Sequence, residues 1–228
     1  MIFVPPFGTV QALRGRTVTD SAGEGPEAAG RRPRSARRAS DGESRSFGSQ
    51  VHALLAGTPV PDAEPEAERL AAVFRRSDLG RRAQRATLVE REFDFLMAVE
   101  GLVVRGQIDL WFEEDGELVV VDYKTDDVRP GEAQDRAHDY ALQLRVYAMA
   151  LERVTGRAPG RAFLHFLRPD RVVEIDLAPS LWESPEQVVR EFQEAQDKLE
   201  FPLNEGERCR RCPFFKDLCP ATLAGEKG

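Results

Sequence analysis

Residues 106–125 read Gly-Gln-Ile-Asp-Leu-Trp-Phe-Glu-Glu-Asp-Gly-Glu-Leu-Val-Val-Val-Asp-Tyr-Lys-Thr. Two apolar runs rich in β-formers flank Asp115-Gly116, a dipeptide typical of a tight hairpin turn. If these two residues form the loop, Asp109 on the first strand lies directly across from Asp122 on the second. The segment therefore predicts a β-hairpin that carries two facing carboxylates.

Facing like charges destabilise a hairpin unless another group neutralises them, and a divalent cation does so well because carboxylate oxygens are its natural ligands. The two-residue period of a strand places Lys124 on the same side as Asp122. Acids and a lysine at an exposed strand edge can also be purely structural. The apolar run 118–121 is typical of a buried central strand, however, which favours a functional site at Asp109, Asp122 and Lys124.

Length and composition indicate one domain of ordinary size, or one domain with extensions. The chain has 228 residues, of which 41% are hydrophobic and 31% charged, enough for a solvated surface around a real core. The net charge of −7 disfavours non-specific coating of nucleic acid but does not exclude a nucleic-acid enzyme. No apolar run is long enough to span a membrane and the start lacks a secretory signal, so a cytoplasmic protein without membrane partners is expected.

Three regions are expected along the chain. Residues 1–46 are rich in Gly, Ala, Pro, Ser and Arg, which predicts a largely disordered segment, either a solvated tail or a basic arm that touches DNA. Residues 47–204 carry the periodic patterns of a folded core. Residues 205–228 form a tail that contains all three cysteines.

Within the core, the pattern predicts an α/β fold with a central mixed β-sheet flanked by helices. The expected order is helices, a three-stranded meander, one long helix, two strands and a final helix. Helices are expected at 48–55, 66–76, 81–86, 133–155 and 183–199, and strands at 89–99, 102–112, 118–124, 161–167 and 171–177.

Five segments resemble, in order, the motifs of the RecB/AddA-type nuclease domain of the PD-(D/E)XK superfamily. They are Gly48-Ser-Gln-Val-His52-Ala-Leu-Leu, Arg91-Glu92-Phe93-Asp94-Phe95, Gly106-Gln-Ile-Asp109, Val121-Asp122-Tyr123-Lys124-Thr125 and Gln143-Leu-Arg-Val-Tyr147. Each piece alone is weak, but five in the right order are specific. The resemblance implies a restriction-endonuclease-like fold, which agrees with the order of elements expected from the pattern.

The resemblance also implies roles for individual residues. His52, Asp109, Asp122 and the backbone carbonyl of Tyr123 become ligands of Mg²⁺ or Mn²⁺, although a lone histidine such as His52 is more often structural on local pattern. Lys124 is expected to orient or activate the attacking water and to stabilise charge at the phosphate. Gln143 and Tyr147, four residues apart on one helix face, line the site, and Glu92 is an outer acid or a ligand of a second metal.

The implied function is a Mg²⁺-dependent DNA exonuclease that acts with a helicase partner in double-strand-break repair and recombination. No Walker-type phosphate loop occurs in the sequence, so the chain carries no helicase motor of its own. Two alternatives remain open. One is a catalytically weak, nuclease-like protein that holds DNA or an assembly together, and the other is a zinc-binding interaction protein built on the cysteine tail.

The tail has the spacing Cys209-x₂-Cys212-x₆-Cys219, which is typical of a metal knuckle. In relatives such a tail supplies three ligands of a [4Fe–4S] cluster, and the fourth cysteine lies upstream of the histidine motif. Here that fourth cysteine is absent. A lost cluster, a non-cysteine or partner ligand, bound Zn²⁺ and free thiols are the alternatives.

Overall fold

The structure is a computed structural model, and it describes residues 11–13, 47–178 and 184–201, together with 203, 205, 206, 209, 212, 214, 215 and 219 in the tail. The segment 1–46, predicted to be largely disordered, lies outside these ranges except for residues 11–13. Those three residues form a short strand, β1 (Gln11–Leu13), which the sequence pattern does not predict. The boundaries of the three regions stay predictions.

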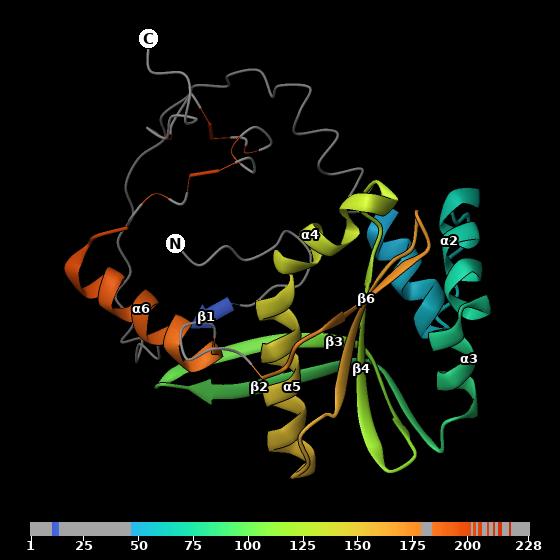
Figure 1. Ribbon diagram of the computed structural model, residues 1–228, viewed down its shortest axis with the longest axis horizontal. Coiled ribbons are helices and arrows are strands. Elements are labelled where there is room, and N and C mark those ends of the chain that lie inside the picture. Colours follow the sequence, from blue (N-terminus) through green and yellow to red (C-terminus); the bar gives the residue numbers. More distant parts are fainter. Residues whose placement is uncertain are drawn as a thin grey trace, which may run out of the picture.

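A mixed sheet forms the centre of the molecule (Figure 1). The meander consists of β2 (Leu88–Val99), β3 (Leu102–Glu114) and β4 (Glu117–Lys124), and its successive strands pair antiparallel. β5 (Arg161–Phe166) lies parallel to β4, and β6 (Arg171–Ile175) pairs antiparallel with β5. β1 and β4 share one edge of β3, because β1 pairs with residues 103–105 and β4 with residues 110–114. The predicted mixed sheet is therefore confirmed.

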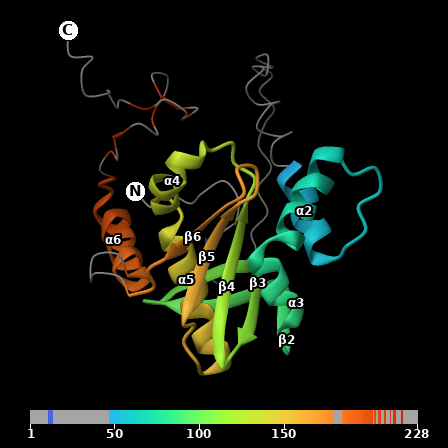
Figure 2. The same cartoon turned by 45° about the vertical axis from the view of Figure 1, so that its right-hand side comes forward.

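Helices cover both faces of the sheet (Figure 2). One layer contains the helix at 47–56, α2 (Pro65–Arg76) and α3 (Asp78–Arg85). The other face carries α5 (Ala141–Thr155), which is preceded by a 3₁₀ turn, η1 (Pro130–Glu132), and by α4 (Ala133–His138). α6 (Pro185–Lys198) packs against α5 and β2. No helix in the described ranges has the length and apolar character that crossing a membrane requires.

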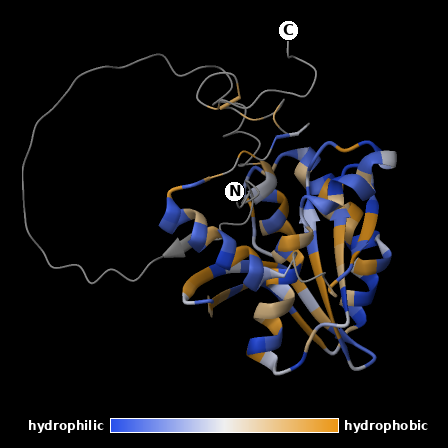
Figure 3. Ribbon diagram, turned by 60° about the vertical axis from the view of Figure 1, so that its left-hand side comes forward, coloured by the Kyte–Doolittle hydropathy of each residue, from blue (hydrophilic) through white to orange (hydrophobic). Residues whose placement is uncertain are grey.

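The two faces of the sheet have separate hydrophobic cores, and the ribbon of the strands between the helix layers carries many residues of high hydropathy (Figure 3). On β4, Leu118 and Val120 pack into the core on the α5 side, whereas Val119, Val121 and Tyr123 pack into the core beneath α2 and α3. This alternation places Asp122 and Lys124 on the α5 side, as the two-residue period predicts.

The hairpin turn is also confirmed. Asp115 and Gly116 have φ angles of 51° and 82°, the left-handed values that a tight hairpin turn requires. The register then runs from Glu114 opposite Glu117 to Leu110 opposite Val121, where the ladder ends. Asp109 and Asp122 lie at the next position, just beyond the last paired residues.

The single long helix predicted for 133–155 is wrong, because the chain breaks between α4 and α5 at Asp139 and Tyr140. Neither residue is a helix breaker. The break is stabilised by tertiary contacts of Tyr140, whose hydroxyl donates to Asp126 and whose ring lies over the Lys124 ammonium. A smaller correction concerns the end of α2, where Ser77 caps α3 by accepting a hydrogen bond from the Gly80 N–H, so that residues 78–80 lie within a helix.

Candidate active site

The β2–β3 hairpin is irregular at the level of Glu92 and Asp109. Regular pairs flank this level, Arg91 with Leu110 and Phe93 with Ile108, but Glu92 and Asp109 do not pair. Glu92 has a φ of 50°, a left-handed value that is uncommon for a residue with a side chain. The pairs on the two sides keep the same register, so the irregularity is a local break in the ladder at Glu92 and Asp109.

A change of core across this level shows the effect of the irregularity. Ile108 belongs to the core on the α5 side, whereas Leu110, two residues later on the same strand, belongs to the core beneath α2. The same change occurs on β2, where Val89 packs beneath α2 but Phe93 packs on the α5 side. Glu92 and Asp109 are thus the two residues at which the hairpin passes from one core to the other.

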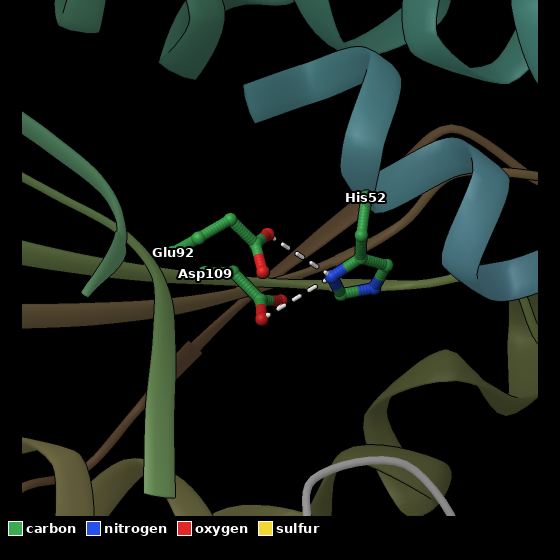
Figure 4. A group of neighbouring side chains, drawn as sticks. All are labelled: His52, Glu92 and Asp109. Carbon is green, nitrogen blue, oxygen red and sulfur yellow. Dashed lines mark ion pairs between the residues drawn. The ribbon is translucent and has the colours of Figure 1, made fainter. Parts of the chain in front are cut away.

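The helix at 47–56 brings His52 to these carboxylates (Figure 4). The His52 Nδ1 atom lies 3.3 Å from Asp109 Oδ1 and 3.5 Å from Glu92 Oε1. The His52 and Glu92 side chains are each 25% exposed. His52 therefore converges on the predicted site, and Glu92, predicted as an outer acid or a ligand of a second metal, lies directly against it.

A second group of polar side chains is fully buried beside the first. The Lys124 ammonium pairs with Asp122 Oδ2 at 2.6 Å and donates to Gln143 Oε1 at 3.0 Å. The Gln143 amide donates in turn to Asp122 Oδ1 at 3.0 Å and to the Tyr147 hydroxyl at 2.6 Å. The structure thus connects Asp122, Lys124, Gln143 and Tyr147 into one hydrogen-bonded network.

The Tyr123 backbone joins the two groups, because its N–H donates to Asp109 Oδ2 at 2.8 Å. Its side chain points to the opposite face of the sheet, where the ring makes edge contacts with Phe74 and His52. That the Tyr123 carbonyl ligates a metal stays a prediction.

The charges of the site shift its pKa values in opposite directions. Burial alone would lower the pKa of His52, but Asp109 and Glu92 outweigh it and raise the pKa well above its ordinary value. Burial opposes ionisation of Asp109, yet the His52 and Lys124 charges and the Tyr123 N–H lower the pKa of this carboxyl. Burial dominates at Asp122 and raises its pKa to about 7, against the attraction of Lys124.

The arrangement fits a divalent cation. Among the described residues, one group of at least three His, Cys, Asp or Glu side chains has all its ligand atoms within 4.8 Å of one another. It consists of His52, Glu92 and Asp109. Asp122 is outside this group, although it was predicted as a ligand with His52 and Asp109. Glu92 Oε1 and Asp122 Oδ2 are both buried, the first 3.5 Å from His52 Nδ1 and the second 2.6 Å from the Lys124 ammonium, and each carboxylate oxygen has a second lone pair that a cation could use.

Several residues around the site were not predicted as functional. Tyr140, Asp126 and Arg136 form a polar cluster against Lys124, and Arg168 donates to the Thr125 carbonyl at 2.8 Å while it pairs with Glu66. Tyr140 lies three residues before Gln143, a spacing that shares a helix face and could have marked it. For Arg168 the sequence carries no comparable signal.

The cysteine tail does not supply the four thiolates of a [4Fe–4S] cluster, because the 228 residues contain three cysteines. Cys209 is buried, whereas Cys212 and Cys219 are partly exposed. The Cys212 N–H donates to the Cys209 carbonyl in a tight turn. Whether Cys209, Cys212 and Cys219 bind Fe–S, Zn²⁺ or no metal stays open.

The sequence profile of the PD-(D/E)XK nuclease superfamily matches residues 28–220, which is most of the chain. The chain therefore belongs to the PD-(D/E)XK nuclease superfamily, as the order of its motifs predicts. Membership of this superfamily supports a hydrolytic nuclease.

Curated relatives are similar to part of the chain. An ATP-dependent helicase/nuclease subunit of Clostridium novyi is 31% identical over 126 residues, which cover 48% of this chain and 10% of the relative. The protein of the same name from Alkaliphilus metalliredigens is 30% identical over 149 residues, covering 58% of this chain and 12% of the relative. The chain thus spans about a tenth of the length of these relatives. The solved structure of a candidate exonuclease from Eubacterium rectale is 12% identical, with a TM-score of 0.47 and coverage of 79% of this chain and 76% of the other.

Proposed function

We propose that the chain is a divalent-metal-dependent DNA exonuclease domain that uses Mg²⁺ or Mn²⁺ and acts beside a helicase in double-strand-break repair and recombination. One observation carries the nuclease chemistry: His52, Glu92 and Asp109 meet directly beside the buried pair of Asp122 and Lys124. The names of the curated relatives support the helicase partnership. The chain spans about a tenth of the length of those relatives, so the helicase partner is part of what we propose.

Each residue has a distinct task in this proposal. His52, Glu92, Asp109 and Asp122 hold the cation, which supplies a water of lowered pKa and polarises the phosphoryl oxygens. Lys124 directs its ammonium toward the phosphate that gains negative charge during hydrolysis. Gln143 fixes the direction of Lys124 by accepting from its ammonium while donating to Asp122.

Substrate binding would rest on contacts to phosphate oxygens, which position DNA without reading its sequence. A free end must reach the site if the enzyme is an exonuclease. A linear duplex and the same duplex closed into a circle therefore separate exonuclease action from endonuclease action.

The test is degradation of end-labelled linear DNA in Mg²⁺, in Mn²⁺ and in EDTA. Wild-type protein should degrade the linear substrate only with metal, and Asp109→Asn and Asp122→Asn should each lower the rate by about a thousandfold or more, which corresponds to about 4 kcal/mol. Asp115→Asn is the matched control, because Asp115 is an exposed acid on the same hairpin and asparagine tolerates its left-handed φ of 51°.

Metal-dependent cleavage that survives both site variants contradicts the proposal. Tight binding of DNA by the wild type in Mn²⁺ without turnover decides for the alternative of a catalytically weak DNA-holding protein. Cleavage of the closed circle at the rate of the linear DNA retains the nuclease but removes the exonuclease assignment.

A further inference from the structure

Tyr140 lies at the break between α4 and α5, and its ring covers the Lys124 ammonium. The Lys124 Nζ atom is 4.5 Å from the centre of the Tyr140 ring, within the range of a cation–π contact. Tyr140 is 3% exposed and Lys124 is 4% exposed, so little water competes with this contact. In a continuous helix over 133–155, the backbone at Tyr140 would have a different course. The break between α4 and α5 therefore helps to place the Tyr140 ring over Lys124.

The ring adds a third constraint to an ammonium that already has two partners. An ammonium has three N–H donors, and Asp122 and Gln143 engage two of them. Lysine is a point charge on a flexible stem, so two partners alone leave its head free to tilt. The Tyr140 ring covers a further side of the ammonium.

A second polar cluster holds the Tyr140 ring in place. The Tyr140 hydroxyl donates to Asp126, and the Arg136 guanidinium donates to the Tyr140 oxygen at 3.2 Å and to Asp126 at 3.3 Å. Arg136 also pairs with Asp139 at the helix break. Burial, followed by the Asp126 charge, raises the pKa of Tyr140, so the phenol remains a neutral donor.

The cluster also connects Lys124 to the loop that follows it. Asp126 lies two residues beyond Lys124, so its bond to Tyr140 ties the end of β4 to the start of α5. An anionic acceptor on the hydroxyl makes the phenol ring richer in electrons, which strengthens its attraction for a cation.

We propose that Tyr140 is a positioning residue for phosphodiester hydrolysis, which fixes the Lys124 ammonium through its ring while Asp126 and Arg136 fix the ring. This inference rests on the proposed nuclease function. It assigns Tyr140 no contact with the substrate. The ring, rather than the hydroxyl, is the part that acts on Lys124.

Two substitutions at Tyr140 separate the ring from the hydroxyl. Tyr140→Phe keeps the ring and removes the bond to Asp126, whereas Tyr140→Leu removes the ring. Tyr140→Leu should lower kcat about tenfold or more and leave the KM for linear DNA within about twofold, because the ring acts on the chemical step and not on DNA binding. Tyr140→Phe should keep at least about a third of the wild-type kcat, because the ring stays buried and still has the Arg136 guanidinium over it, 5.2 Å from its centre, after the hydroxyl bonds are lost.

Phe163→Leu is the matched control. Phe163 is a ring 4% exposed that lies between two cations, with Arg161 at 4.7 Å and Arg82 at 5.4 Å from its centre, but it packs on the opposite face of the sheet. This variant should lose a cation–π ring as Tyr140→Leu does and retain the wild-type kcat and KM.

A spectroscopic measurement tests the contact without relying on activity. The chain contains four lysines, so selective ¹³C,¹⁵N-lysine labelling gives four sets of signals, and Lys124→Met identifies the set that belongs to Lys124. The ring current of Tyr140 should shift the Lys124 side-chain resonances upfield of those of the other lysines. Tyr140→Phe should keep this shift and Tyr140→Leu should abolish it.

The outcomes separate this inference from the nuclease proposal. A wild-type protein that cleaves no DNA contradicts the nuclease function, while the lysine spectra still report on the contact. Cleavage that Lys124→Met abolishes but Tyr140→Leu leaves at the wild-type kcat overturns the role of Tyr140 alone. An equal loss of kcat in Phe163→Leu, or an unshifted Lys124 signal in the wild type, overturns it as well.

Discussion

The two halves of the candidate site are built in opposite ways. His52 and Glu92 are each 25% exposed, and they meet at an irregular level of the hairpin. Asp122 and Lys124 are 1% and 4% exposed and project from the regular alternation of a central strand. The open half presents partly exposed side chains to a cation, whereas the buried half holds a charge pair whose geometry is fixed before any substrate arrives.

The halves also differ in how their charges are balanced. In the open half, the Nδ1 atom of the imidazole faces two carboxylates at 3.3 and 3.5 Å, and a cation would be held among the same three side chains. In the buried half, one ammonium balances one carboxylate, and an amide and a phenol complete the hydrogen bonds. Loss of a group should therefore affect cation binding in the open half and folding as well as chemistry in the buried half.

The largest effect is expected from Lys124→Met. It should reduce hydrolysis by about a thousandfold or more and lower the free energy of unfolding by about 3 kcal/mol at pH 8, because Asp122 loses the ammonium that favours its ionised form and must either stay charged without a partner or take up a proton. Cleavage assays and urea unfolding measure the two effects.

Arg161→Met is the control for the stability part of this prediction. Arg161 pairs with Glu174 at 2.8 Å, but the two side chains are 43% and 50% exposed and the pair is screened by solvent, so its loss should change the free energy of unfolding far less than the loss of Lys124 does. Equal losses of unfolding free energy in Lys124→Met and Arg161→Met would show that the buried pair stabilises the fold no more than an exposed pair does.

A smaller effect is expected in the open half. His52→Asn should weaken Mn²⁺ binding about tenfold, which corresponds to about 1.4 kcal/mol, while the urea midpoint stays near that of the wild type. Isothermal titration of Mn²⁺ into the protein measures the affinity. His138→Asn, which changes an exposed histidine on α4, should leave it unchanged. Unaltered Mn²⁺ affinity in His52→Asn would remove His52 from the cation site.

The smallest effect is expected at His165, whose pKa is shifted in the opposite direction to that of His52. Burial lowers the pKa of His165, although its Nε2 atom lies 2.9 Å from Asp170. The unfolded chain then binds a proton more readily than the folded one, so the stability that neutral His165 contributes is present above its ordinary pKa and is lost as the pH falls below about 6.5.

Urea unfolding at pH 7.5 and pH 5.5 tests this sign. The wild type should lose more stability between the two pH values than His165→Gln does, because the glutamine does not titrate. A larger loss in the variant would mean that His165 is stabilised as a cation.

The buried half and its hairpin could be predicted because their signals are local. Asp115-Gly116 determines the register, and the two-residue period determines the side on which Asp122 and Lys124 lie. The three-residue separation of Tyr140 and Gln143 was readable as a shared helix face. The helix break that turns Tyr140 onto Lys124 was not, because it depends on Asp126 and Lys124 and on no proline or glycine.

The open half was harder to predict for a similar reason. A left-handed glutamate inside a strand has no signature in the sequence, so Glu92 was expected as an outer acid or a ligand of a second metal, and its contact with His52 was not predicted. The position of His52 depends on how the helix at 47–56 packs beneath the sheet, and only its resemblance to a known motif indicated a role.

The φ of 50° at Glu92 has a consequence for engineering this protein. A side chain in that conformation costs about 1–2 kcal/mol, a strain that glycine would not carry. Selection for heat resistance alone should therefore favour Glu92→Gly, and the same change would discard a carboxylate that faces His52. Directed evolution for thermal stability alone would therefore select the loss of a proposed metal ligand. Selection for cleavage in each round would prevent this.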